Sequence, residues 1–284
     1  MARHFKYVQF IDQMNYSITF ACYNQIDYTK KCISSMTDAG IPLDRLAIVD
    51  NASSDETWSY LQSLQLGAAI RNADNLGCGV AWNQGALALQ SEWTIIMNND
   101  VIVSPRWLDG LIGTAEKNNL DIISPAMIEG PLNYDFLDFA EKSSVNARNV
   151  LRAGWAHAVC LAVHKRVWKE VGYFRATPKL LGYEDTIFFH EARLAGMSVG
   201  TTGASWLHHY GSITQSAMKR ERGLQTSDDL GYRYNHRLLH QSWFNRKMDK
   251  VRLNRQLRAW SASEQASLGH SLWGNSSGSV LTWN

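Results

Sequence analysis

The chain has 284 residues, of which 45% are hydrophobic and 19% charged, and its formal net charge of +2 indicates no particular class of partner. This size and composition suit one large domain, or one domain with an extension. Cys22, Cys32, Cys78 and Cys160 lie far apart without a C-x-x-C pair, which argues against a disulfide framework or a zinc site. No window approaches the roughly 20 apolar residues of a membrane span, and the N-terminus lacks a signal-type apolar run, so we expect a cytoplasmic protein.

Apolar, β-branched segments alternate with amphipathic ones along the first hundred residues. We expect strands at 16–21, 46–49, 68–70 and within 94–103, and helices at 28–37, 56–66, 80–89 and from Pro105. This β-α-β-α-β-α-β order predicts an α/β fold with a mostly parallel sheet and right-handed crossovers. Such a start often binds a nucleotide. However, the glycine patterns of dinucleotide oxidoreductases and P-loop nucleotidases are both missing from the sequence.

The second part of the chain is less regular. We expect strands at 120–124, 154–163 and 199–207, short helices at 167–171 and 186–194, and a loop or hairpin over 129–152. From about Gln215 the sequence becomes rich in Lys and Arg, and from about Ser261 it becomes rich in Ser and Gly. These shifts predict a first domain over 1–215, followed over 216–284 by a basic helical extension and a flexible tail.

The run from Thr94 to Val103 carries the strongest chemical signal. Its buried strand ends abruptly in Asn98, Asn99 and Asp100. In an open α/β sheet, ligands bind just beyond the carboxyl ends of the strands. A carboxylate flanked by amides can hold a hard divalent cation that also contacts phosphate oxygens. The alternative is a polar turn between two strands.

Six segments, taken together and in order, resemble the family-2 glycosyltransferases of GT-A fold. The segments are 17–24, 49–57, 75–77 with 83–85, 97–101, 182–185 and 209–212. The likeness covers roughly residues 15 to 215 and is strongest to the rhamnosyltransferase-like branch. It implies a Rossmann-like, mostly parallel mixed sheet flanked by helices. Because that branch uses many donors and acceptors, the resemblance implies the reaction without naming the sugar.

The resemblance implies that a divalent metal assists departure of a nucleoside diphosphate. The family's D-x-D motif corresponds to Asn98-Asn99-Asp100, so Asp100 would bind the metal. Asn98 replaces the first carboxylate, which removes one charge without removing the metal ligand. His208 or His209 would be the second ligand, and the His-x-Gly-Ser spacing favours His209. An imidazole ligand suits Mn²⁺ better than Mg²⁺. Both histidines could instead belong to the core or the surface.

The resemblance also implies a nucleotide-sugar pocket. Asp50 would hydrogen-bond the base, and Ala21 and Tyr23 would contact it from the end of the first strand. The rest of this pocket would be formed by Asn75, Gly79, Asn83, Asn98 and Asn99. Asp50 could instead cap a helix or form a turn, and Asn83 could be a solvated helix residue.

The catalytic base implied by the resemblance is Asp185, with Glu184 orienting the acceptor and the anomeric centre inverting. Repulsion between adjacent carboxylates raises one pKa, which helps a base to work near neutral pH. The alternative role of the pair is stabilisation of a helix N-terminus. Trp155 and His157 are candidate contacts for the acceptor or the diphosphate, although an aromatic side chain in a strand is more often part of the core.

Three functions are compatible with these residues. The first is transfer from a UDP-, dTDP- or GDP-sugar to a surface glycan or glycolipid, with the basic C-terminal region holding the protein on anionic lipid. The second is the same chemistry on a modified base in nucleic acid, because aromatic and basic residues alternate after Gln215. The third is a non-catalytic nucleotide-sugar binding protein, suggested by Asn98.

Overall fold

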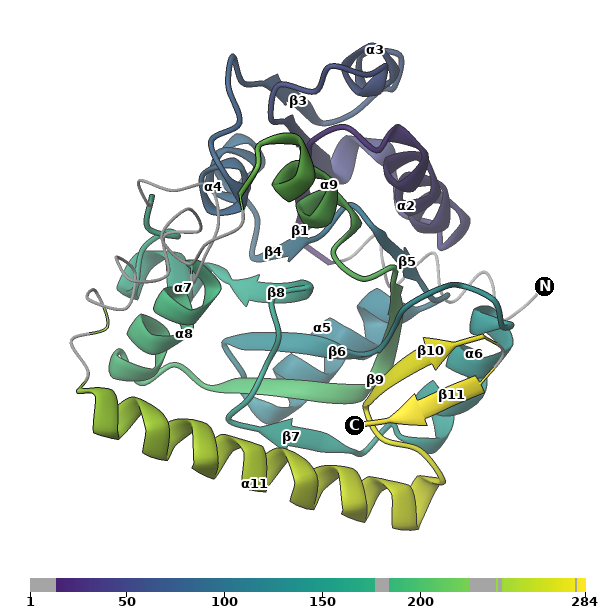
Figure 1. The fold of residues 1–284 in the computed structure, drawn as a ribbon, viewed down its shortest axis with the longest axis vertical. Coiled ribbons are helices and arrows are strands. Elements are labelled where there is room, and N and C mark those ends of the chain that lie inside the picture. The colour runs from purple at the N-terminus through teal and green to yellow at the C-terminus, as the bar shows by residue number, and fades with distance from the viewer. Residues whose placement is uncertain (1–13, 177–183, 225–238, 240–241, 279) are drawn as a thin grey trace.

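The computed structural model describes residues 14–176, 184–224, 239, 242–278 and 280–284 (Figure 1). Its first half contains strands β1 (Tyr16–Cys22), β2 (Leu46–Asp50), β3 (Ala68–Arg71) and β4 (Trp93–Met97), with helices α2 (Ile26–Asp38), α3 (Thr57–Gln62) and α4 (Cys78–Ala88) between them. β1 lies parallel to β2 and β4, and β2 lies parallel to β3. This arrangement confirms the predicted parallel α/β start.

Helices cover both faces of this sheet, which explains why its central strands are apolar throughout. Successive residues of β4 point to opposite faces. Ile95 packs in a core cluster with residues of α2, whereas Ile96 packs in a second cluster with Trp82 of α4. Both isoleucines are fully buried. The continuous apolar run of β4 is therefore what a strand between two helical layers requires.

The second half of the chain completes a mixed sheet. It contains β5 (Val101–Val103), α5 (Trp107–Asn118), β6 (Ile122–Glu129), α6 (Phe136–Asn146), β7 (Leu151–Ala153), β8 (Cys160–His164), α7 (Lys165–Glu170), α8 (Glu184–Leu194), β9 (Val199–His209) and α9 (Ile213–Glu221). β8 lies antiparallel between β4 and β6, and β9 pairs with β5, β6 and β7. The GT-A-like fold expected from the sequence is thus confirmed.

Two expectations for this half were wrong in detail. The segment 129–152 is not a loop or hairpin, because it contains α6 and β7. Asp135 caps α6 by accepting a hydrogen bond from the Asp138 backbone N–H at 3.0 Å. The strand expected over 154–163 is shorter, and Trp155 and His157 lie in the segment that precedes β8.

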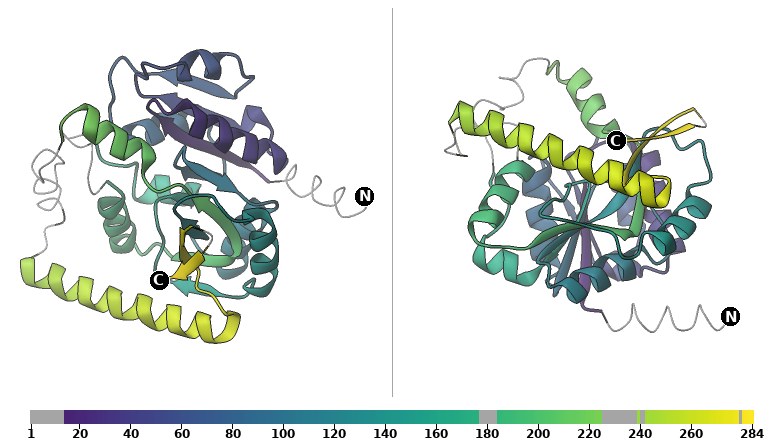
Figure 2. Two further views of the ribbon diagram at one scale, coloured as in Figure 1. Left: turned by 45° about the vertical axis from the view of Figure 1, so that its right-hand side comes forward. Right: turned by 90° about the horizontal axis from the view of Figure 1, so that it is seen from below.

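The C-terminal part contains the long helix α11 (Trp243–Leu268) and strands β10 (Trp273–Ser277) and β11 (Val280–Trp283) (Figures 1 and 2). β10 pairs in parallel with β6, and β11 pairs antiparallel with β10. The helical extension is confirmed, but the region expected to be a flexible tail instead adds a hairpin to the sheet. No helix in the described part of the chain is long and apolar enough to cross a membrane.

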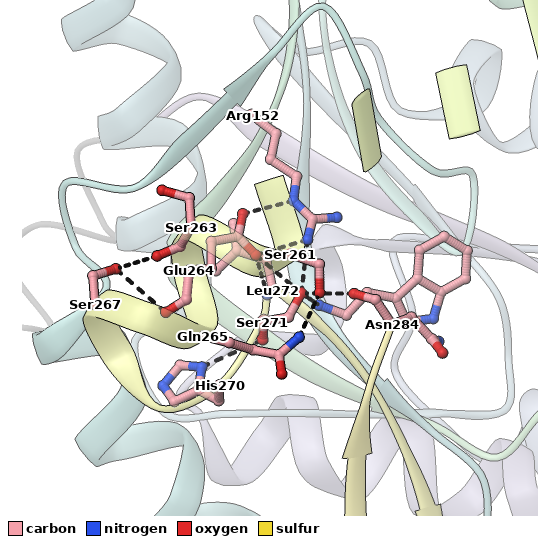
Figure 3. Close-up of polar contacts among 11 residues, drawn as sticks. Arg152, Ser261, Ser263, Glu264, Gln265, Ser267, His270, Ser271, Leu272 and Asn284 are labelled. Atoms are coloured by element: carbon pink, nitrogen blue, oxygen red, sulfur yellow. Dashed lines mark hydrogen bonds and ion pairs between the residues drawn. The ribbon is translucent and has the colours of Figure 1, made fainter. Parts of the chain in front are cut away.

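A buried ion pair attaches this C-terminal part to the rest of the molecule (Figure 3). Arg152 of β7 donates from Nε to Glu264 Oε1 at 2.8 Å and from Nη2 to Oε2 at 2.7 Å. The two side chains are only 2% and 5% exposed. Glu264 also accepts from Ser271 Oγ and from the Leu272 backbone N–H. One carboxylate of α11 therefore links β7 to the segment that leads into β10.

Replacing Glu264→Ala should lower the free energy of unfolding by about 3–5 kcal/mol, because it leaves the Arg152 charge buried without its partner. Urea denaturation followed by circular dichroism measures this loss. The double variant Arg152→Leu/Glu264→Leu should recover part of the stability, since no charge then remains buried. Lys142→Ala, which breaks the exposed pair with Asp138, is the control and should change the stability little. An equally small effect of Glu264→Ala would contradict this account.

Candidate functional site

A cavity of about 1450 Å³ lies beyond the carboxyl ends of β1, β4, β6 and β9. Its lining also includes the beginnings of α4 and α8, residues of α9, and residues of α11. The volume exceeds the roughly 300–1,000 Å³ of most small-molecule pockets. It is therefore large enough for a nucleotide sugar together with part of an acceptor.

Asp100 and His209 meet in this cavity, although they lie far apart in the sequence. In the antiparallel pairing of β5 with β9, Val101 lies opposite His209. The Nε2 atom of His209 therefore lies 3.3 Å from Asp100 Oδ1. Both residues are almost fully buried and line the cavity. The other carboxylate oxygen of Asp100 accepts a hydrogen bond from the Ile213 backbone N–H at 3.0 Å. The start of α9 is thereby attached to Asp100.

This pair fits a metal ion. Two adjacent ligands that are each about 2.1 Å from an octahedral ion lie about 3 Å apart, close to the 3.3 Å between these two atoms. A carboxylate oxygen with an imidazole nitrogen is a donor set that Mn²⁺ accepts. Within the described residues, no three His, Cys, Asp or Glu side chains form a metal cluster. A metal held here would need further ligands besides Asp100 and His209.

The structure distinguishes between the two neighbouring histidines. Because side chains alternate along a strand, His208 points away from Asp100, and its Nδ1 lies 3.0 Å from the Tyr134 hydroxyl. His208 does not line the cavity. Burial lowers its pKa to about 4, and the neighbouring His209 adds to this effect. Of the two candidate metal ligands, only His209 is therefore placed to act.

The amides of Asn98 and Asn99 also lie in the cavity. Asn98 Nδ2 is 3.3 Å from His209 Nε2, so the residue that replaces the motif's first carboxylate contacts the candidate metal ligand. Asn99 donates to Thr29 Oγ1 at 3.0 Å and accepts from Thr214 Oγ1 at 3.1 Å. Asn99 therefore ties α2 to α9 across the end of β4.

The residues expected to hold the nucleotide divide into two groups. Ala21, Tyr23 and Asn75 line the cavity. Asn75 contacts Met218 of α9 through Nδ2 at 3.3 Å, and the Arg222 guanidinium lies 5.6 Å from the Tyr23 ring. These contacts place α9 over the ends of β1 and the start of α4.

Asp50, Gly79 and Asn83 do not line the cavity. Asp50 is fully buried and accepts from the Ser53 backbone N–H at 3.1 Å, which is the turn role that the sequence left open. Asn83 exchanges two hydrogen bonds with the backbone of Phe174, at 2.7 and 3.0 Å, so its side chain holds the loop at Phe174.

Gly79 lies where α4 faces Phe174 and the start of α8. A Cβ atom there would lie 3.3 Å from the Phe174 Cβ, which is tight, and 3.4 Å from the Glu184 Cβ, which is an ordinary van der Waals contact. A side chain at position 79 would therefore require Phe174 to shift slightly. The expected contact of Gly79 with a nucleotide stays a prediction.

Glu184 and Asp185 form the first turn of α8 and both line the cavity. Burial raises the pKa of Asp185, and hydrogen bonds from the Thr186 backbone N–H and hydroxyl oppose this shift. Gly182 and Tyr183, which belong to the same sequence motif, lie outside the described residues. The carboxylate of Asp185 is thus favoured as a proton acceptor by its surroundings.

Trp155 and His157 also line the cavity. The Trp155 ring stacks on Trp273 of β10 with 5.5 Å between centroids. His157 Nε2 lies 2.7 Å from the Pro125 carbonyl oxygen, and burial lowers the pKa of His157 to about 4. His157 is therefore neutral at physiological pH.

Sequence reasoning missed several residues that line the cavity. They are Asn51 after β2, Glu129 at the end of β6, Gln215 and Met218 of α9, Arg246 and Lys250 of α11, and Trp273 of β10. Glu129 Oε2 lies 4.0 Å from His209 Nδ1. Its position at the carboxyl end of a strand was the signal that could have identified it, but the strand was expected to end at Ser124.

A family model and solved structures match this fold. Residues 17–151 match the model of glycosyl transferase family 2, and a search of curated proteins found no match. The chain is similar to GalNAc-T7, solved with UDP, GalNAc and Mn²⁺, at 13% identity and a TM-score of 0.56. The aligned part covers 69% of this chain and 44% of GalNAc-T7.

Two microbial structures are similar to the same degree. The mannosyltransferase PcManGT from Pyrobaculum calidifontis, in complex with GDP-Man and Mn²⁺, is 15% identical with a TM-score of 0.54, covering 78% of this chain and 67% of that one. S. aureus TarS with UDP-GlcNAc is 16% identical with a TM-score of 0.51, covering 69% of this chain and 58% of that one. At these identities the likeness shows a shared fold, and the rhamnosyltransferase-like branch stays a prediction.

Acid should destabilise the folded protein over the pH range from about 6.5 to about 4. The upper limit is the pKa of an unfolded histidine, about 6.5, and the lower limit is the lowered pKa of His208, about 4. The unfolded state binds a proton in this range that the folded state does not, so stability falls as the pH falls. For one such histidine the loss is on the order of 2–3 kcal/mol. His208→Phe should reduce the difference in unfolding free energy between pH 7 and pH 4.5, measured by urea denaturation. An unchanged difference would show that His208 does not carry this effect.

Proposed function

We propose that this chain, which belongs to the family-2 glycosyltransferases, transfers a sugar from a nucleoside-diphosphate sugar to a hydroxyl of a glycan or glycolipid, with inversion. The observation that carries the proposal is the convergence of a metal-ligand pair, Asp100 with His209, and a carboxylate with a raised pKa, Asp185, on one cavity. A polar turn alone does not account for Asp100, which lies between β4 and β5, meeting residues from α8 and β9 there.

The nucleotide of the donor would lie between the end of β1 and α9. Tyr23 and Asn75 line that end of the cavity, and Met218 and Arg222 of α9 lie against them. Solved structures of this fold hold UDP, UDP-GlcNAc or GDP-Man. We therefore expect a UDP-, GDP- or dTDP-sugar as the donor.

Asp100 and His209 would hold a divalent cation, Mn²⁺ or Mg²⁺, between them. Such a cation neutralises the charge that develops on a departing diphosphate. Asn98 contacts the same His209 nitrogen, Nε2, and would release it when a cation binds there. The backbone N–H of Ile213 orients the Asp100 carboxylate.

Asp185 would act as the general base. Its carboxylate accepts the proton of the acceptor hydroxyl, whose oxygen bonds to the anomeric carbon as the bond from that carbon to the diphosphate breaks. Attack from the side opposite the leaving group inverts the anomeric centre. Glu184 lies beside Asp185 in the first turn of α8 and would orient the acceptor.

The presence of both Asp100 and Asp185 in the cavity favours catalysis over a purely binding function. Arg246 and Lys250 of α11 border the same cavity. They would attract an anionic headgroup or phosphate near the acceptor, in keeping with a cytoplasmic protein bound peripherally to a membrane. An assay that compares sugar transfer to glycans and to nucleic acid would distinguish the alternative acceptor, a modified base in nucleic acid.

Asp185→Asn should leave UDP or GDP binding intact and lower turnover by roughly 10²–10⁴-fold, because only proton acceptance is lost. Isothermal titration with the nucleotide and a coupled assay of released nucleoside diphosphate measure the two quantities. Burial raises the pKa of Asp185. In the unchanged protein, activity should therefore be lost on acidification at a higher pH than the usual aspartate pKa of about 3.9. Full turnover by Asp185→Asn would rule out this base.

His209→Gln should weaken the Mn²⁺-dependent part of nucleotide affinity by at least about 10-fold, because it removes one of two protein ligands. His208→Gln is the matched control, since it alters the neighbouring residue, which lies outside the cavity. Thermal shift with UDP and GDP, with and without Mn²⁺, compares the two variants. Equal effects of both substitutions would contradict the metal role of His209.

A further inference from the structure

Two tryptophans form an aromatic surface inside the cavity. The rings of Trp155 and Trp273 stack with centroids 5.5 Å apart and planes 27° apart. Both side chains line the cavity and are partly exposed. Trp273 lies in β10, outside the segment 17–151 that matches the family model. The C-terminal hairpin therefore contributes a part of the cavity that the matching segment does not contain.

The buried ion pair holds this surface in place (Figure 3). The Arg152 guanidinium lies 5.6 Å from the Trp155 ring and donates to Glu264 and to Ser271 Oγ. Ser271 lies two residues before Trp273, whose backbone N–H donates to the same hydroxyl at 3.4 Å. Arg152 thus contacts Trp155 directly and is linked to Trp273 through Ser271.

Two polar atoms beside the rings have no partner among the described residues. The carbonyl of Pro125 can only accept, so the 2.7 Å contact with His157 requires the proton to be on Nε2. His157 Nδ1 is then an acceptor, and it is buried without a partner. The indole Nε1 of Trp273 is a donor that is likewise buried without a partner. Buried polar groups left without partners are costly and call for an explanation.

We propose that Trp155, Trp273 and His157 form an acceptor subsite that binds one sugar ring. This inference rests on the proposed function and names the acceptor's chemical class as a glycan. The apolar C–H face of a pyranose packs on aromatic rings, as other apolar surfaces do. The unpartnered atoms of His157 and Trp273 are buried, so a sugar hydroxyl, which can both donate and accept, would reach them only after a small rotation of these side chains. A nucleobase also stacks on tryptophan and is the competing ligand that the experiment includes.

The test is saturation-transfer NMR on the full chain with UDP and Mg²⁺, with saturation of upfield-shifted methyl protons of the protein, which the probes do not share. The probes are the methyl glycosides of glucose, galactose, mannose and rhamnose, and thymidine as a nucleoside. At least one methyl glycoside should receive saturation in the unchanged protein. Trp273→Leu should weaken its binding by roughly 2- to 10-fold, the range expected from one lost aromatic contact.

Trp283→Leu is the matched control because Trp283 belongs to the same hairpin but not to the cavity lining. It stacks on Phe139 with 5.8 Å between centroids. This variant should bind the glycoside as the unchanged protein does, and both variants should keep their UDP thermal shift. If Trp273→Leu fails to fold, Trp155→Leu takes its place with the same expected loss.

Four outcomes would overturn the subsite. Three of them are unchanged glycoside binding in Trp273→Leu, an equal loss in Trp283→Leu, and binding of thymidine without any methyl glycoside. The fourth is the absence of every glycoside signal in a protein that binds UDP, which would leave the proposed function intact. Absence of UDP and GDP binding in the unchanged protein would instead contradict the proposed function itself.

Discussion

The antiparallel pairing of β5 with β9 is the constraint on which the site depends. Its register sets Val101 opposite His209, which leaves Asp100 Oδ1 3.3 Å from the imidazole. The backbone of Asp100 also accepts a hydrogen bond from the Tyr210 N–H at 3.0 Å, and its side chain accepts one from Ile213. A slip of one residue would turn His208 toward Asp100 and His209 into the aromatic cluster around Tyr134. Strand register, more than the identity of either histidine, therefore determines which imidazole is available to a metal.

The Arg152–Glu264 pair extends this organisation to the C-terminal part of the chain. Burying two charges is favourable only when their hydrogen bonds are satisfied, and here the guanidinium and the carboxylate are joined by two short bonds. The pair brings β10 beside β6 and Trp273 beside Trp155. The lining of the cavity thus combines residues at the ends of β1, β4, β6 and β9 with residues of α9, α11 and β10.

Burial shifts the pKa values of titratable groups in the cavity and beside it. It raises the pKa of Asp185 and lowers those of His157 and His208, because in each case the charged form loses its hydration. The result is a carboxyl group suited to accepting a proton and two histidines that remain neutral. The same property that supports the chemistry makes the fold sensitive to acid, since unfolded histidines bind protons that these two exclude.

The sequence by itself determined the parallel start of the sheet and the polar ends of its strands. Local patterns suffice for both, because the apolar run before Asn98 and the first turn at Glu184 are specified by adjacent residues. Tertiary structure decided the rest. Asp50 and Asn83 have the residue types of ligands, but their partners, Ser53 and the Phe174 backbone, are known only from the folded chain. The C-terminal hairpin was hidden because its Ser/Gly-rich composition is typical of a flexible tail. Its strands are stabilised by pairing with β6, which lies more than a hundred residues earlier in the chain, and no local pattern encodes such a distant partner.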